Sequence, residues 1–223
     1  MTPQMGLFFS AIAFVATHFL LSHPLRGPLV RAMGEKAFQG LYSVVALILF
    51  GLMIYFYRAI GREGPQLWHS GEAAWIAGTI LMWLASILFV GSFMGNPALP
   101  GSPGPTGGPK GVFLITRHPM MWSFALWAAV HLMILGQPKS AVFDGAIIIL
   151  AIGGAAAQDR KKERQFGENW HDWTAQTAFV PFTRGIAYPG TAAFVGGTLL
   201  FLLATWLHGP IADMPAGIWR WIG

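Results

Sequence analysis

Long apolar runs separated by short polar stretches dominate the sequence. Six of these runs approach the roughly 20 residues that an α-helix needs to cross the hydrocarbon core of a bilayer. They lie at residues 5–22, 38–57, 74–93, 120–136, 142–157 and 191–207. The pattern predicts an all-α fold, a polytopic transmembrane helical bundle with about six spans.

The chain ends in a short aromatic segment, residues 218–222, which carries Trp219 and Trp221. Tryptophans favour the headgroup level of a membrane, so we expect an interfacial tail there. We therefore predict one integral membrane domain over residues 1–223. It consists of a core at residues 5–184 and a C-terminal span with its tail at residues 185–223.

The composition agrees with a membrane location. Hydrophobic residues make up 54% of the chain and charged residues only 10%, whereas an average soluble domain is about 25% charged. The expected partner is the lipid bilayer. The net charge of +5 then reads as a topology signal, and we expect no nucleic-acid partner.

Lysine and arginine are distributed unevenly between the two sides of the predicted bundle. Ten lie in the loops after the first, third and fifth spans, namely Arg26, Arg31, Lys36, Lys110, Arg117, Arg160, Lys161, Lys162, Arg164 and Arg184. Four lie on the other side, namely Arg58, Arg62, Lys139 and Arg220. The positive-inside rule places the ten in the cytoplasm and both termini on the non-cytoplasmic side.

Histidine is the main candidate for a metal ligand, because the chain has no cysteine and seven histidines. His18 and His131 fall within predicted spans, where ionisable groups are rare and often functional. The alternative is a neutral imidazole hydrogen-bonded to a neighbouring helix. His23 lies at a helix end, and we expect His69, His171 and His208, in loops or at edges, to be solvated.

The triplet Arg117-His118-Pro119 precedes the fourth span. It places a cation and an imidazole at a helix N-terminus, where backbone N–H groups favour anions. Arg117 and His118 are therefore the candidate catalytic residues; the alternative for Arg117 is interfacial anchoring. Asp159 and Glu163 are four residues apart and would share a helix face, either in a site or on a solvated helix extension.

Four segments together resemble the NnrU family, which includes bacterial proteins linked to denitrification and a plant 15-cis-zeta-carotene isomerase. They are residues 17–26, Thr116-Arg117-His118-Pro119, Leu126-Trp127 with His131, and Phe166-Gly167 with Val180-Pro181-Phe182. The resemblance covers nearly the whole chain.

The resemblance implies a haem b cofactor in the bacterial inner membrane. It assigns His18 and His131 as iron ligands, with His118 a third candidate. The implied activity is cis–trans isomerisation of a hydrophobic small molecule such as a 15-cis carotenoid. Ala128 stands where the isomerase has a cysteine three residues before the fourth-span histidine, so ligand exchange between Cys and His is impossible here.

Two other functions remain open. The Arg-His-Pro and Phe-Gly-x-x-Trp motifs also resemble membrane methyltransferases that modify isoprenylcysteine or phospholipid amines with S-adenosylmethionine. Asp159 and Glu163 could serve there, although the adjacent Glu-Glu pair of those enzymes is missing. The third possibility is a non-enzymatic haem-binding accessory protein related to nitrogen oxides in denitrification.

The depth of the histidines leaves the ligand pair open. His131 lies roughly 20 Å along the helix from His118, and about 6 Å separates His18 from the cytoplasmic end of its own helix. On straight helices His18 would therefore be closer in depth to His118 than to His131.

Overall fold

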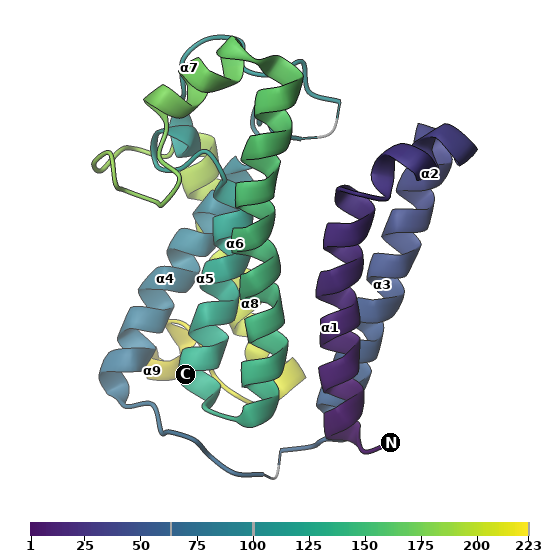
Figure 1. The fold of residues 1–223 in the computed structure, drawn as a ribbon. Helices are drawn as coiled ribbons and strands as arrows, with labels where there is room; N and C mark the ends of the chain where they lie inside the picture. Colours follow the sequence, from purple (N-terminus) through teal and green to yellow (C-terminus); the bar gives the residue numbers. More distant parts are fainter. Residues whose placement is uncertain (63, 100, 223) are drawn as a thin grey trace. The chain divides into compact units, whose positions relative to one another are not determined.

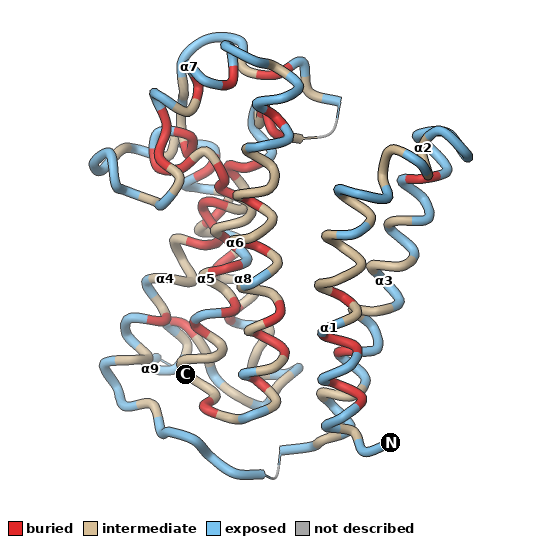
Figure 2. The backbone as a smooth tube through the Cα atoms, in the orientation of Figure 1, coloured by how far each residue is buried: buried red, intermediate tan, exposed pale blue. Residues whose placement is uncertain are grey.

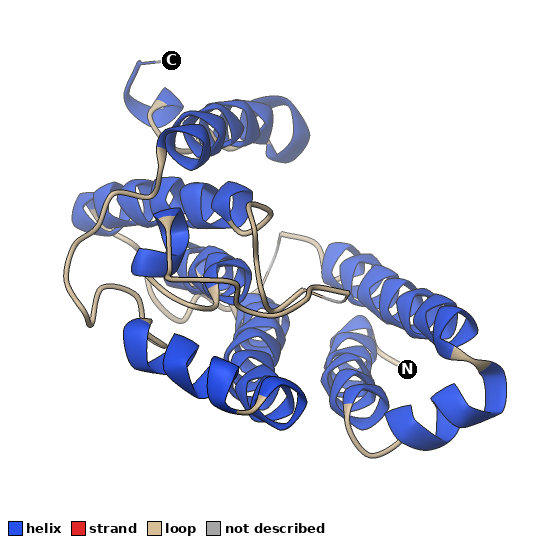
Figure 3. Ribbon diagram, turned by 90° about the horizontal axis from the view of Figure 1, so that it is seen from above, coloured by secondary structure: helices blue, strands red, loops and turns tan. Residues whose placement is uncertain are grey.

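The computed structural model describes residues 1–62, 64–99 and 101–222, and within these ranges it contains helices and loops but no strands (Figures 1 and 3). The long helices are α1 (Pro3–Ser22), α3 (Glu35–Ala59), α4 (Glu72–Gly91), α5 (Pro119–Leu135), α6 (Pro138–Phe166) and α8 (Thr191–Ala212). The short ones are α2 (Arg26–Met33), the 3₁₀ turn η1 (Gly111–Leu114), α7 (Glu168–Gln176) and α9 (Trp219–Ile222).

Five of these helices, α1, α3, α4, α6 and α8, are long and apolar enough to cross a membrane. Helix α5 is equally apolar but has only 17 residues. The prediction of an all-α, polytopic membrane protein is therefore confirmed, and all six predicted runs are helical. The fifth run was predicted too short, because α6 continues from its apolar part through a charged segment to Phe166.

One compact unit comprises residues 1–69 and 135–150. Here α1 and α3 run antiparallel, joined by α2 (Figure 1). Gly6 permits their close packing, since a Cβ at this position would lie 2.5 Å from the ring of Phe56. Tyr57 at the end of α3 hydrogen-bonds to Ser140 of α6 at 3.0 Å, which ties the first turns of α6 to this unit.

The other unit comprises residues 70–134 and 151–223. Helices α4 and α8 pack directly: a Cβ on Gly197 would lie 2.4 Å from the Cα of Ile87, and Trp83 Nε1 donates to Thr198 Oγ1 at 2.9 Å. A hydrophobic cluster that includes Val112, Ile115 and Trp170 unites α4, η1 and α7.

That cluster explains the apolar stretch at residues 112–116. The stretch begins in η1, and the side chains of Val112 and Ile115 are buried in protein. The Pro/Gly-rich connection before it forms no helix in its described residues.

The exposed faces of the long helices are apolar. Leu47 on α3 is 69% exposed and Leu199 on α8 is 62% exposed. Figure 2 shows exposed positions along α1 and α3 and a concentration of buried positions near α7. Water would penalise such surfaces, whereas a lipid bilayer covers them.

Candidate functional site

The segment that precedes α5 is held by the segment that follows α7. Arg117 N donates to Ala178 O at 2.8 Å, and Thr116 Oγ1 donates to Phe179 O at 2.8 Å. Thr116 also accepts from the backbone N–H of His118 at 3.2 Å. These bonds fix the backbone of Arg117 and His118 before the helix begins at Pro119.

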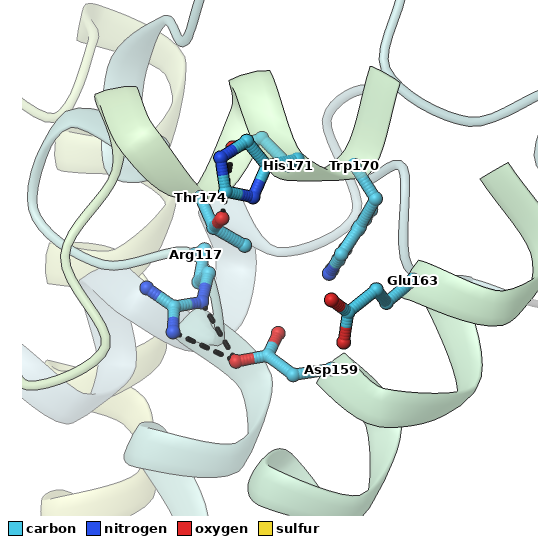
Figure 4. A pocket seen from close by; sticks show the side chains of 6 residues that line it. All are labelled: Arg117, Asp159, Glu163, Trp170, His171 and Thr174. Atoms are coloured by element: carbon cyan, nitrogen blue, oxygen red, sulfur yellow. Dashed lines mark hydrogen bonds and ion pairs between the residues drawn. The ribbon is translucent and has the colours of Figure 1, made fainter. Parts of the chain in front are cut away.

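Both side chains converge on one carboxylate, that of Asp159 in α6. Arg117 donates from Nε at 2.9 Å and from Nη2 at 2.7 Å to Asp159 Oδ2 (Figure 4). His118 Nε2 lies 2.9 Å from Asp159 Oδ1. The anion that faces Arg117 and His118 is thus the Asp159 carboxylate of the same chain. Charge-assisted hydrogen bonds of this kind are about twice as strong as neutral ones.

The His118 side chain is fully buried. Its Nδ1 has no hydrogen-bond partner among the residues that the structure describes. A neutral imidazole that donates from Nε2 to Asp159 leaves an unprotonated acceptor at Nδ1, and this tautomer avoids an unpaired buried N–H donor.

A pocket of about 210 Å³ opens beside this cluster. Its lining residues are Arg117, Asp159, Glu163, Trp170, His171 and Thr174 (Figure 4). Asp159 and Glu163 face the same pocket from successive turns of α6, which confirms that they share a helix face. The pocket is polar, so it suits a small polar group rather than a polyene chain.

Sequence reasoning missed the contributions of Trp170, His171 and Thr174 to this pocket. They lie on α7, which begins after Gly167, a residue with the positive φ of 54° that lets the chain turn after α6. The Phe166-Gly167-x-x-Trp170 spacing was the available signal. It marked the turn but not which faces of α7 would meet Arg117.

The side chains of His18 and His131 make the same type of hydrogen bond to their own helices. His18 Nδ1 lies 2.7 Å from Phe14 O, and His131 Nδ1 lies 2.8 Å from Trp127 O. Each ring bonds to the carbonyl four residues earlier in its own helix, not to a neighbouring helix. A proton on Nδ1 leaves the Nε2 lone pair available, which is the form in which an imidazole ligates a metal.

The structure places His18 and His131 in different compact units, and His118 in the Asp159 cluster. It brings His131 together with a different histidine, His208 of α8, whose ring centre lies 6.1 Å away. Within the described ranges, no group of three or more His, Asp or Glu side chains could hold a metal ion.

The fold and this site define a polytopic α-helical membrane protein with a polar cluster where Arg117 and His118 meet Asp159 of α6. A profile of the NnrU protein family matches residues 6–216. The chain therefore belongs to the NnrU family.

Two curated relatives are similar to this chain. The chloroplastic 15-cis-zeta-carotene isomerase of Arabidopsis thaliana is 25% identical over 188 residues, which cover 81% of this chain and 50% of the relative. That of Zea mays is 25% identical over 161 residues, covering 68% and 43%. The chain thus spans about half the length of the curated relatives that it matches. No solved structure matches it.

Proposed function

We propose that the protein is a membrane isomerase that acts on a cis double bond of a hydrophobic polyene, such as a 15-cis carotenoid. The observation that carries the proposal is the similarity of 81% of the chain to a relative named as such an isomerase. The apolar helix surfaces support it, because they give a lipid-soluble substrate access from the bilayer. Isomerisation leaves the atoms and electrons of the substrate unchanged.

Haem b is the proposed cofactor, with His131 as one iron ligand and His18 as the second that the family resemblance implies. The Nδ1 bonds of both rings to backbone carbonyls support this role, since they orient Nε2 away from the parent helix. When bound, haem supplies an iron centre that can interact with the polyene. The chain's part is to orient the imidazoles and to exclude water from the site.

Arg117 and His118 remain the proposed catalytic residues of the polar cluster. Their support is the shared Asp159 carboxylate, which holds a proton at His118 Nε2 beside the pocket. The guanidinium of Arg117 donates two hydrogen bonds to the Asp159 carboxylate, which favours its anionic form and holds it in place. Arg117, which lines the pocket, can bind and orient a polar group that enters it, and His118 lies behind it on the shared carboxylate.

The activity is tested with the purified full chain in liposomes that contain 15-cis zeta-carotene. Chromatography of extracted pigment in the dark should show conversion of the 15-cis isomer, dependent on protein. A protein that carries haem yet leaves the isomer ratio unchanged would overturn the isomerase proposal and leave the non-enzymatic haem-binding function.

One observation favours a second candidate, a membrane methyltransferase. The pocket sets two carboxylates, Asp159 and Glu163, one helical turn apart beside Arg117, and such a site could hold the amino and carboxyl groups of S-adenosylmethionine. Titration calorimetry with S-adenosylmethionine separates the two functions. Saturable binding that is lost in Glu163→Gln would favour the methyltransferase; the isomerase proposal expects none.

We further propose that the protein resides in a bacterial inner membrane with both termini on the non-cytoplasmic side. The uneven distribution of lysine and arginine along the chain supports this orientation of the termini.

A further inference from the structure

The pocket beside Arg117 lies where two helices change from apolar to polar residues. In α6, Asp159 is the first charged residue after the apolar run at residues 142–157, and Glu163 follows one turn later. In α5, the apolar helix begins directly after Arg117 and His118. The hydrogen bonds between Arg117 and Asp159 join the helices at this transition. In a membrane protein such a transition marks the level of the lipid headgroups.

The charges that line the pocket do not balance. The guanidinium of Arg117 and the carboxylate of Asp159 form an ion pair at 2.7 Å and neutralise each other. The exposed carboxylate of Glu163 makes no hydrogen bond or ion pair with any residue that the structure describes. The pocket therefore carries one uncompensated negative charge, which favours a ligand with a positively charged group.

The pocket also has a buried hydrogen-bond donor without an acceptor. Trp170 is only 1% exposed, and its Nε1–H has no partner within residues 1–62, 64–99 and 101–222. Figure 4 shows the indole nitrogen directed into the pocket, on the side where Glu163 lies. A buried donor left unpaired is costly, so an acceptor oxygen that enters the pocket would be stabilised there.

Arg117 keeps further donors for such an oxygen. Its Nε and Nη2 donate to Asp159, and its Nη1 donates to Thr177 O at 3.2 Å. Nη1 and Nη2 each carry a second N–H, and the side chain remains 14% exposed. Arg117 can therefore donate to an anionic oxygen without giving up Asp159. The pocket thus pairs an unpaired anion, Glu163, with unused donors on Arg117 and Trp170.

We propose that this pocket binds the headgroup of an ethanolamine phospholipid from the surrounding bilayer. The primary ammonium pairs with the Glu163 carboxylate, and the phosphate oxygens accept from Arg117 and from Trp170 Nε1. A choline headgroup offers no N–H to Glu163. A glycerol headgroup brings the negative phosphate beside Glu163 without an ammonium to compensate it. The charges of the pocket therefore select the ethanolamine lipid.

The size and the position of the pocket favour a lipid headgroup. Its volume of about 210 Å³ is below the roughly 300–1,000 Å³ of pockets that enclose a whole small-molecule ligand. A headgroup needs less room than a nucleoside cofactor, because its acyl chains stay in the membrane. The inference names the polar group that Arg117 is proposed to orient, and it does not depend on isomerisation of a polyene.

The test titrates the full chain, purified in detergent, with dihexanoyl phospholipids that differ only in an ethanolamine, choline or glycerol headgroup. Isothermal titration calorimetry gives the affinities. Glu163→Gln removes the charge, and Trp170→Phe removes the indole N–H but keeps an aromatic ring. Glu168→Gln is the matched control, because this exposed carboxylate in the first turn of α7 does not line the pocket. Circular dichroism checks that each variant is folded.

We expect the ethanolamine lipid to bind about tenfold more tightly than the other two lipids. Glu163→Gln should abolish this preference and Glu168→Gln should keep it, whereas Trp170→Phe should weaken the binding of every lipid with a phosphate. Equal affinities for the three lipids, or an unchanged preference in Glu163→Gln, would overturn the headgroup site. Displacement of the lipid by S-adenosylmethionine would also overturn it and would assign the pocket to the methyltransferase candidate. Equal affinities or an unchanged preference would leave the isomerase proposal standing, because the measurement is of lipid binding alone.

Discussion

Asp159 holds the polar cluster of Arg117 and His118 together. Its carboxylate accepts from Arg117 with one oxygen and contacts His118 with the other. Arg117 also donates to Thr177 O at 3.2 Å. One carboxylate thus ties the start of α5 to α6 and, through Arg117, to the end of α7.

Asp159→Asn keeps the shape of this side chain but removes its charge. The buried His118 and the largely buried Arg117 would lose their anionic partner, and breaking a buried pair in this way costs about 3 kcal/mol. We expect a loss of about 2–3 kcal/mol in the free energy of unfolding, measured by thermal or denaturant unfolding in detergent. Glu163→Gln, an exposed carboxylate one turn further, is the control and should change stability by about 0.5 kcal/mol or less. Equal stability of the two variants would contradict this role of Asp159.

At the residue scale, the sequence marked Arg117, His118 and Asp159 as candidates but did not show their contacts. Arg117 and His118 were predicted to attract an anion and Asp159 was identified as a candidate, yet nothing in the spacing showed that residues about 40 positions apart would meet. His208 was predicted to be solvated, because its position near the end of a run gave no sign of the helix that faces it. Contacts between helices are set by packing, which one-dimensional patterns do not contain.

At the scale of elements, close helix packing depends on glycine. Gly197 of α8 lies against the backbone of Ile87 in α4, so an added Cβ would meet main-chain atoms at 2.4 to 2.7 Å. These atoms cannot rotate away as a side chain can. The α4–α8 contact therefore requires the absence of a Cβ at this position.

Gly197→Ala should push α4 and α8 apart and destabilise the protein by about 1–3 kcal/mol, as overpacking does. Gly209→Ala is the matched control on the same helix, because nothing lies within 4 Å of the Cβ that it would add. Unfolding midpoints in one detergent, compared for both variants and the wild type, give the answer. If both alanine variants were as stable as the wild type, the helices would not depend on this close approach.

The helices themselves were predictable to within a few residues wherever hydrophobicity marked them. The helical segments that were not predicted are those that hydrophobicity does not mark. Helix α2 and the last turns of α6 carry charges, so an apolar window ended before them. The Lys- and Arg-rich part of α6 still favours a helix by intrinsic propensity, and α6 ends where Gly167 takes a positive φ.

At the scale of the whole molecule, charge distribution predicts orientation. Ten lysines and arginines lie on one side of the predicted spans and four on the other. Reporter fusions at residue 110 or 165 should read cytoplasmic, and a fusion at the C-terminus should read external. A cytoplasmic C-terminus would mean that one apolar helix does not cross, and the 17-residue α5 is the first to examine.

The membrane class of the protein followed from composition alone, and the NnrU family from motifs that lie far apart in the chain. The existence of two compact units did not. Only three-dimensional contacts reveal that α6 contributes its first part to one unit and its second part to the other, since the hydrophobic pattern is the same throughout.

We propose that this NnrU-family protein isomerises a polyene and that His131 is needed for the reaction. The most direct measurement is the isomer ratio of zeta-carotene in dark-grown cells that accumulate the 15-cis form and express the wild type, His131→Gln or His69→Gln. We expect at least a tenfold fall in the 15-cis fraction with the wild type and the His69→Gln control, and no fall with His131→Gln. Equal 15-cis fractions in cells with and without the expressed wild-type protein would contradict it.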